Sequence, residues 1–303
     1  MAYLRLIRPY NLFIVLISQV ILQYFIIVPL SDDPIVLSGV LFPLFVLDTL
    51  IVAAAGYVIN DLKDYKADLI NKPDKTYIPH PVSSKAALMY YSILVGAGFI
   101  ISLFLAIRTQ NLKHIWIYPA ATLFLYAYAV KLKSTVLWGN ILVSVFIAAV
   151  TGILFFAQFT SGTDFIHKTS LMEICLVYML FSFLVNLFRE IIKDLEDVRG
   201  DKSQKVITLP LVYGKQRTKY LGYLVIMVQI ILIICWAFMS GLTEDFSIRI
   251  FLILFVAAPM TALIIKLYQA EKPRDFGAVS KMTKLIMLAG LVSLLLIAKQ
   301  LSV

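Results

Sequence analysis

The chain has 303 residues, of which 61% are hydrophobic and 15% are charged, and its mean hydropathy is +0.89. Soluble domains have roughly 45–50% apolar and about 25% charged residues, so this composition excludes an ordinary soluble fold and indicates a protein that lies in a bilayer. The net charge of +9 does not indicate nucleic-acid binding, because the basic residues lie in short stretches between apolar runs.

Nine apolar runs are long enough, or nearly so, to cross a hydrocarbon core, which takes about 20 helical residues. The runs are continuous rather than alternating, which favours helices over a barrel. The sequence therefore predicts an all-α membrane protein with nine transmembrane helices, at residues 11–29, 38–59, 86–107, 114–131, 138–159, 171–190, 218–240, 248–268 and 282–300.

The connections between these runs differ in their basic residues. The connections on the same side of the membrane as the N-terminus, counted together with the N-terminal segment, hold 22 of the 27 lysines and arginines. Positively charged residues mark the cytoplasmic side. We therefore expect an integral, multi-pass protein of the cell membrane whose two long loops, 60–85 and 189–219, face the cytoplasm. The other side holds five basic residues: Arg108, Lys113, Lys168, Arg249 and Lys299.

The pattern D-x-x-D-x-x-x-D occurs twice, once after the second predicted span and once after the sixth. The two copies are 133 residues apart and consist of Asp61, Asp64 and Asp68, and of Asp194, Asp197 and Asp201. On a helix this spacing places three carboxylates within roughly 60° of one face. The repeat predicts one domain over residues 1–303, in which two similar four-helix units, 11–135 and 138–268, surround one central cavity. The helix at 282–300 is additional.

Each acidic stripe predicts a bound cation, because like charges at this spacing repel each other. Carboxylates together with phosphate oxygens and water are the environment that Mg²⁺ prefers. Lysines and arginines near the stripes could bind the phosphate oxygens that the metal leaves free. The general preference for basic residues on the cytoplasmic side is an alternative explanation for each of them. These basic residues are Lys72, Lys75, Lys131, Lys133, Arg189, Lys193 and Arg199.

The two stripes and the basic residues together predict a site for a metal-chelated prenyl diphosphate at the cytoplasmic rim, with the prenyl tail among the spans. Metal and basic side chains would stabilise the diphosphate as it leaves the allylic carbon. The resulting carbocation needs a dry cavity with aromatic walls. The aromatic residues near the basic ends of the fourth to sixth spans are candidates for those walls: Phe124, Tyr126, Tyr128, Trp138 and Phe188.

Five segments carry a resemblance to a known family. They are NDLKDYKAD at 60–68, INKPDK at 70–75, LK-x5-GN at 132–140, REIIKDLEDVRGD at 189–201 and LP-x2-YG at 209–214. In these segments, and over nearly its whole length, the chain resembles the UbiA superfamily of intramembrane prenyltransferases.

The resemblance implies a function for individual residues. Asn60, Asp64, Asp68, Asp197 and Asp201 match the ligands of Mg²⁺ and diphosphate, and the four aspartates among them are the expected catalytic residues. Asp61 and Asp194 occupy additional acidic positions and are expected to bind metal as well, with two Mg²⁺ ions in total. The resemblance also implies that Arg8 and Lys133 engage the diphosphate or shape the pocket. Tyr128 and Asn140 are expected to bind substrate because of their positions near the ends of the spans, with a helix–helix hydrogen bond as the alternative for Asn140.

The acceptor of the prenyl group is less well defined by the sequence. The INKP segment is most similar to archaeal digeranylgeranylglyceryl phosphate synthases, which implies a geranylgeranyl or similar donor and a glycerophosphate ether lipid as acceptor. However, Lys75 replaces the usual arginine of that segment, and an aromatic acceptor of quinone (menaquinone-type) biosynthesis is the alternative. An ion-coupled transporter is the alternative from another class, but its carboxylates would lie nearer the bilayer midplane.

Overall fold

A computed structural model describes residues 1–31, 35–158 and 169–301. The regular elements in these ranges are all helices, so the prediction of an all-α protein is confirmed. Lys168 and the last residue of the predicted span 138–159 lie outside the described residues.

Each of the nine predicted apolar runs is helical over nearly all of its described part; residues 38–40, 131 and 240 are the exceptions. In chain order the elements are α1 (Ala2–Leu6), α2 (Pro9–Ile21), η1 (Leu22–Ile27), α3 (Val28–Leu30), α4 (Leu41–Asn71), η2 (Pro73–Lys75), α5 (Ser84–Thr109), α6 (Lys113–Val130), η3 (Leu132–Ser134), α7 (Trp138–Gln158), α8 (Thr169–Ser203), α9 (Leu209–Met239), η5 (Gly241–Thr243), α10 (Phe246–Phe251), η6 (Leu252–Ala257), α11 (Ala258–Gln269) and α12 (Pro273–Leu301).

Eight helices in the described ranges are long and apolar enough to cross a membrane, which makes the chain an integral multi-pass membrane protein. The predicted span at 114–131 is not among them. It forms helix α6, but α6 begins with Lys113 and His114 and contains Pro119, so it is less apolar than the others. A ninth crossing by α6 therefore stays a prediction.

Two of the spans contain a turn of π-helix, and in both a proline follows it. The π turns are η1 and η6, and the prolines are Pro29 and Pro259. A proline has no N–H to donate, and its ring collides with the carbonyl four residues earlier. A wider turn before the proline relieves that collision without ending the helix.

Helices α4 and α8 continue well beyond the predicted spans, to Asn71 and Ser203 rather than to residues 59 and 190. The apolar pattern marks only the part that suits lipid, whereas the following leucines, lysines and alanine are good helix formers. Pro73 then ends α4, because the residue before a proline disfavours the helical conformation. Both aspartate motifs therefore lie on helices, as their spacing requires.

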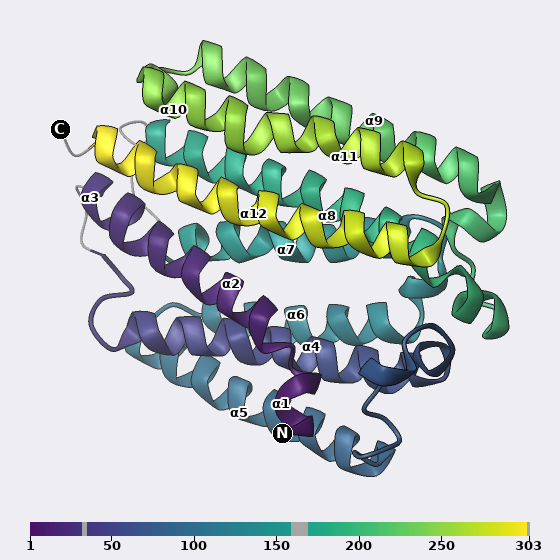
Figure 1. Ribbon diagram of the computed structural model, residues 1–303. Helices are drawn as coiled ribbons and strands as arrows, with labels where there is room; N and C mark the ends of the chain where they lie inside the picture. The colour runs from purple at the N-terminus through teal and green to yellow at the C-terminus, as the bar shows by residue number, and fades with distance from the viewer. Residues whose placement is uncertain (32–34, 159–168, 302–303) are drawn as a thin grey trace.

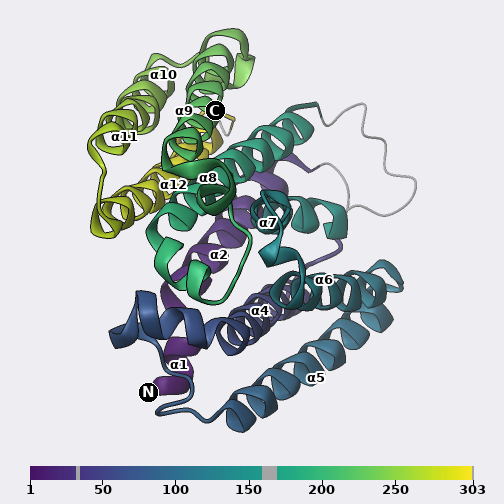
Figure 2. The same cartoon turned by 90° about the vertical axis from the view of Figure 1, so that its right-hand side faces the viewer.

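Helix α8 is at the centre of the bundle and packs against α4, α7, α9 and α12. Helices α4, α5 and α6 pack together on one side of it, and α9 to α12 lie on the other side, while α2 contacts α4, α7 and α12 between the two groups (Figure 1). The chain turns from α4 to α5 and from α8 to α9 at the same end of the bundle, which faces the viewer in Figure 2. The two aspartate motifs are thus brought to one end.

Candidate active site

The C-terminal ends of α4 and α8 are clamped together by Asn71. Its Nδ2 donates to the backbone carbonyl of Asp197 at 3.0 Å, and its Oδ1 accepts from the backbone N–H of Gly200 at 2.8 Å. A Cβ at Gly200 would lie 2.3 Å from Asn71 Nδ2 and 2.6 Å from the carbonyl oxygen of Ala67. Only glycine allows the two acidic helices to approach this closely.

Three basic side chains from other parts of the chain pair with the aspartates. Lys72 Nζ lies 2.7 Å from Asp197 Oδ1, and Lys133 forms an ion pair with Asp64. Because Lys72 follows α4 and Asp197 is on α8, the first pair also ties the two motifs together. Burial lowers the pKa of both lysines, but the neighbouring carboxylates outweigh burial, so both pKa values are raised above their usual range. Both lysines are therefore cationic at neutral pH.

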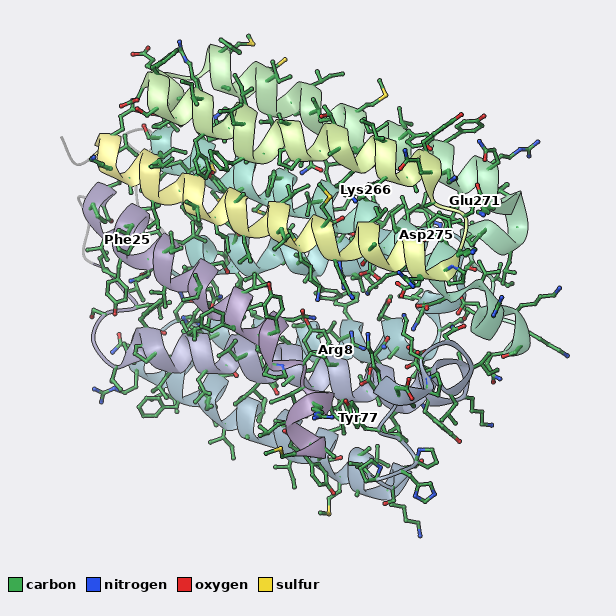
Figure 3. The ribbon with its side chains drawn as sticks, viewed as in Figure 1. Arg8, Phe25, Tyr77, Lys266, Glu271 and Asp275 are labelled. Carbon is green, nitrogen blue, oxygen red and sulfur yellow. The ribbon has the colours of Figure 1, made fainter. Side chains whose placement is uncertain are left out.

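The third basic residue, Arg8, enters from the N-terminal segment. Its Nη2 lies 2.5 Å from Asp61 Oδ1, and its guanidinium lies 4.9 Å from the centre of the Tyr57 ring. Arg8 has a φ of +52°, a left-handed conformation that is uncommon for arginine and marks a position held by its surroundings. Figure 3 shows Arg8 at the start of α2, beside α4.

Gly139 and Asn140, at the start of α7, each have a structural role. A Cβ at Gly139 would lie 2.9 Å from the carbonyl oxygen of Leu132 and 3.0 Å from the Cα of Lys133, so glycine lets η3 and Lys133 pack against α7. Asn140 Nδ2 donates to Asp194 Oδ2 at 2.9 Å. Asn140 thus makes the helix–helix hydrogen bond that was the alternative to substrate binding, and it orients an aspartate of the second motif.

The six motif aspartates form one acidic end. The charges of Asp64 and Asp201 are within electrostatic reach of each other, as are those of Asp194 and Asp201, and Asp201 is buried. Asn60 and Tyr128 are half-buried at the edge of this group, and the Tyr128 hydroxyl is within reach of Asp64 and Lys133. By contrast, the side chains of Lys75 and Lys131 are exposed, and neither forms an ion pair within the described ranges.

The sequence analysis missed three residues that the structure places at or beside this site. Asn71 holds the two motif helices together, and Glu190 accepts from Arg189 at 2.9 Å and from Lys193 at 2.8 Å. Lys284, on α12, is the third. A signal was present for two of them, because Glu190 and Lys284 are charged residues within or next to apolar spans, where such residues are rare and often functional.

A cavity lies inside the bundle, between α2, α4, α7, α8 and α12, and it is lined by Tyr57 and Arg189, which precede Asp61 and Asp194 by four and five residues. Its empty volume is about 890 Å³, including the open mouth. Polar side chains, among them Asn11, Tyr57, Arg189 and Lys284, line one part of it, and the remainder is mainly apolar. The shape and polarity suit a molecule with an anionic head and a hydrocarbon tail.

The expectation about aromatic walls was wrong in part. Phe124, Tyr126 and Trp138 are exposed on the outside of the bundle, and Phe188 is packed in the core. The aromatic residues that do line the cavity are Tyr57, Tyr178 and Phe181.

The donor set at the acidic end fits Mg²⁺ that shares its coordination with a phosphate ligand. Within the described ranges, no group of three or more histidine, cysteine, aspartate or glutamate side chains is arranged to hold a metal ion by itself. Mg²⁺ usually keeps waters and binds through one or two carboxylates plus substrate phosphates, so such a group is not required. Six aspartates against three paired cations leave a negative surplus that a divalent cation would offset.

Comparison with known proteins shows the family of the chain. The model of the UbiA prenyltransferase family matches residues 19–288. The chain therefore belongs to the UbiA prenyltransferase family and is a prenyltransferase of the membrane. It is 32% identical over 238 residues to the digeranylgeranylglyceryl phosphate synthase of Methanococcus aeolicus, covering 78% of this chain and 77% of the relative. It is 34% identical over 219 residues to that of Methanobrevibacter smithii, covering 70% and 69%.

Solved structures share the fold over nearly the full length. A digeranylgeranylglyceryl phosphate synthase structure superposes with a TM-score of 0.68 at 26% identity, covering 99% of this chain and 98% of the other. A UbiA homologue from Archaeoglobus fulgidus, bound to DMAPP and Mg²⁺, superposes with a TM-score of 0.60 at 17% identity, covering 97% and 99%.

Proposed function

We propose that this chain transfers a prenyl group, geranylgeranyl or one of similar length, from a prenyl diphosphate to a glycerophosphate ether lipid, and that the reaction requires Mg²⁺. The observation that carries the proposal is the meeting of two aspartate stripes at one end of the bundle, near a largely apolar cavity whose lining includes Tyr57 and Arg189. The names of the relatives support the choice of acceptor. The homologue bound to DMAPP and Mg²⁺ supports the metal.

In this proposal the four catalytic aspartates, Asp64, Asp68, Asp197 and Asp201, hold the metal. Asn60, Asp61 and Asp194 complete the acidic surroundings. Mg²⁺ bound there would act as a Lewis acid on the diphosphate oxygens and stabilise the leaving group. Two divalent ions would offset the surplus of three negative charges and leave one positive charge toward the diphosphate.

The chain's own basic residues would bind the phosphate oxygens that the metal leaves free. Lys72 and Lys133 stand next to Asp197 and Asp64, and each could turn from its carboxylate to a phosphate oxygen. Arg8 is placed in the same way beside Asp61. Three cations fixed around the leaving group stabilise the charge that develops on it.

The cavity would protect the allylic cation once the carbon–oxygen bond has ionised. Tyr57, Tyr178 and Phe181 present aromatic rings to the cavity, and such rings attract a cation. The apolar walls exclude water, which would otherwise capture the cation and give the free prenyl alcohol.

The placement in the membrane follows from the same proposal. We infer nine crossings, with α6 included, around the central cavity and with the active site opening toward the cytoplasm. The basic residues near the acidic end support this orientation. The acidic residues at helix ends, rather than at mid-helix, also favour an enzyme over an ion-coupled transporter.

The test is metal-dependent turnover of the purified protein with labelled geranylgeranyl diphosphate and shorter donors. Each donor is offered with a glycerophosphate ether lipid and, separately, with an aromatic acid. We expect transfer to the ether lipid with Mg²⁺ and none with EDTA. Transfer to the aromatic acid alone would replace this acceptor assignment with the quinone-type one. Ion flux without any transfer would overturn the proposed function.

A further inference from the structure

A second charged group lies on α8 before the aspartates, and its surplus charge is positive. It consists of Arg189, Glu190 and Lys193 with Lys284 of α12, and we call it the inner cationic cluster. Arg189 Nη1 and Lys193 Nζ both donate to Glu190 Oε1, at 2.9 and 2.8 Å. Lys284 Nζ donates to Asn11 Oδ1 at 2.9 Å, and its charge is within reach of both Arg189 and Glu190.

The inner cationic cluster begins before the second aspartate motif on α8. Arg189 precedes Asp194 by five residues, which corresponds to about 7.5 Å at the α-helical rise, whereas Lys193 is next to Asp194. Arg189 and Lys284 line the cavity, with Asn11 beside Lys284. The cluster therefore lies between the acidic end and the apolar part of the cavity.

The charge of the cluster is incompletely balanced. Three cations surround one carboxylate, so two positive charges remain. The Arg189 side chain is only 13% exposed and is paired with Glu190, but its Nε is a buried donor without a hydrogen-bond partner among the described residues. A buried donor without a partner and a buried surplus of positive charge are both costly, so this arrangement points to an anionic ligand in the cavity.

We propose that the inner cationic cluster binds the phosphate of the acceptor lipid, at a place distinct from the donor diphosphate; this inference rests on the proposed function. A phosphate monoester carries about −1.5 to −2 charges at neutral pH, which matches the positive surplus of the cluster. The acidic end has the opposite charge, and it binds phosphate only together with a metal. The donor diphosphate thus binds at the aspartates because it brings divalent cations, and the acceptor phosphate binds at the inner cationic cluster because it brings none.

The location of the cluster also suits the chemistry. With the diphosphate at the aspartates and the prenyl tail in the cavity, the allylic carbon lies near the cluster. An acceptor phosphate held there would bring its glycerol hydroxyl toward that carbon, so that the ether C–O bond forms while the hydroxyl proton passes to the released diphosphate. It would also neutralise cations that otherwise repel the allylic carbocation, since unlike charges attract and like charges repel strongly where water is excluded.

The kinetic test compares Lys284→Gln with Lys281→Gln, an exposed lysine one turn earlier on α12. Steady-state rates are measured with geranylgeranyl diphosphate and with two acceptors, the glycerophosphate ether lipid and the same lipid without its phosphate. We expect Lys284→Gln to raise the KM of the phosphorylated acceptor about tenfold, the loss of one charge-assisted hydrogen bond. The donor KM and the rate with the dephosphorylated acceptor should change less than about twofold. Lys281→Gln should match the unsubstituted protein.

A raised donor KM in Lys284→Gln, with an unchanged ratio between the two acceptors, would assign the cluster to the diphosphate and overturn the proposal. A binding measurement distinguishes failure of this inference from failure of the proposed function. In EDTA, glycerol phosphate should raise the unfolding temperature of the unsubstituted protein and of Lys281→Gln, and should raise that of Lys284→Gln much less. If glycerol phosphate stabilises all three proteins equally or none of them, the inference is wrong whether or not turnover is observed.

Discussion

Replacement of Gly200 by alanine tests the contact that brings the two acidic helices together. The new Cβ would lie 2.3 Å from Asn71 Nδ2 and 2.6 Å from the backbone oxygen of Ala67. The Asn71 side chain could move away, but the Ala67 carbonyl belongs to α4 itself. The substitution therefore either separates α4 from α8 or displaces the clamp.

The expected cost can be estimated from these contacts. Displacing Asn71 loses two hydrogen bonds, each worth about 0.5–1.5 kcal/mol net. Forcing a methyl group into a filled space costs about 1–3 kcal/mol more. Alanine is a better helix former than glycine by roughly 1 kcal/mol, which offsets part of this. We expect a net destabilisation of about 1–5 kcal/mol, together with a large loss of activity, because the aspartates of the two motifs move apart.

The assay is thermal unfolding in detergent, with turnover measured on the same samples. Gly96→Ala is the matched control, because Gly96 lies inside α5 and a Cβ there would meet nothing within 4 Å. That variant should be as stable as the unsubstituted protein or slightly more so. If Gly200→Ala were as stable and as active as Gly96→Ala, the close approach of the two motifs would not be needed for the site.

The remaining predictions concern the metal ligands, the loop cation and the topology. Asp64→Asn and Asp197→Asn should each lower turnover by about 10²-fold or more while the bundle stays folded; near-native rates at limiting Mg²⁺ would contradict the ligand assignment. Lys75→Arg should leave donor affinity within about twofold, because Lys75 is exposed and remains cationic when replaced; a tenfold change would place it in the diphosphate site. A single cysteine placed in 60–85 or in 189–219 should resist labelling by an impermeant reagent in intact cells; labelling from outside would reverse the proposed orientation.

The sequence predicted the helices well where hydropathy is informative. All nine apolar runs are helical over nearly all of their described parts, because a helix satisfies its backbone hydrogen bonds without help from neighbouring segments. The ends of α4 and α8 were placed too early, since the residues beyond 59 and 190 are polar. In a membrane protein, loss of apolar character marks the lipid boundary, and helix propensity alone decides whether the helix continues.

The grouping of the aspartates was predictable from the sequence, and the finer contacts around them were not. The repeated aspartates share one spacing, and that spacing is a local property of a helix. The clamp by Asn71 joins positions more than 120 residues apart, and Lys284 meets Asn11 across 273 residues. No local pattern encodes such pairs. The aromatic walls were misassigned for a similar reason, because a helix that is apolar all round does not show which face turns inward.

The position of the aspartates along their helices gives a reason why a bound metal would stabilise them. Asp68 lies in the last turn of α4, and Asp201 in the last turn of α8. A helix C-terminus carries partial negative charge, so each carboxylate there is disfavoured by about 0.3–1 kcal/mol. The two are also close to other carboxylates, which adds repulsion. Divalent cations would reverse both effects at once, so Mg²⁺ with a diphosphate should stabilise this end of the bundle more than either ligand alone.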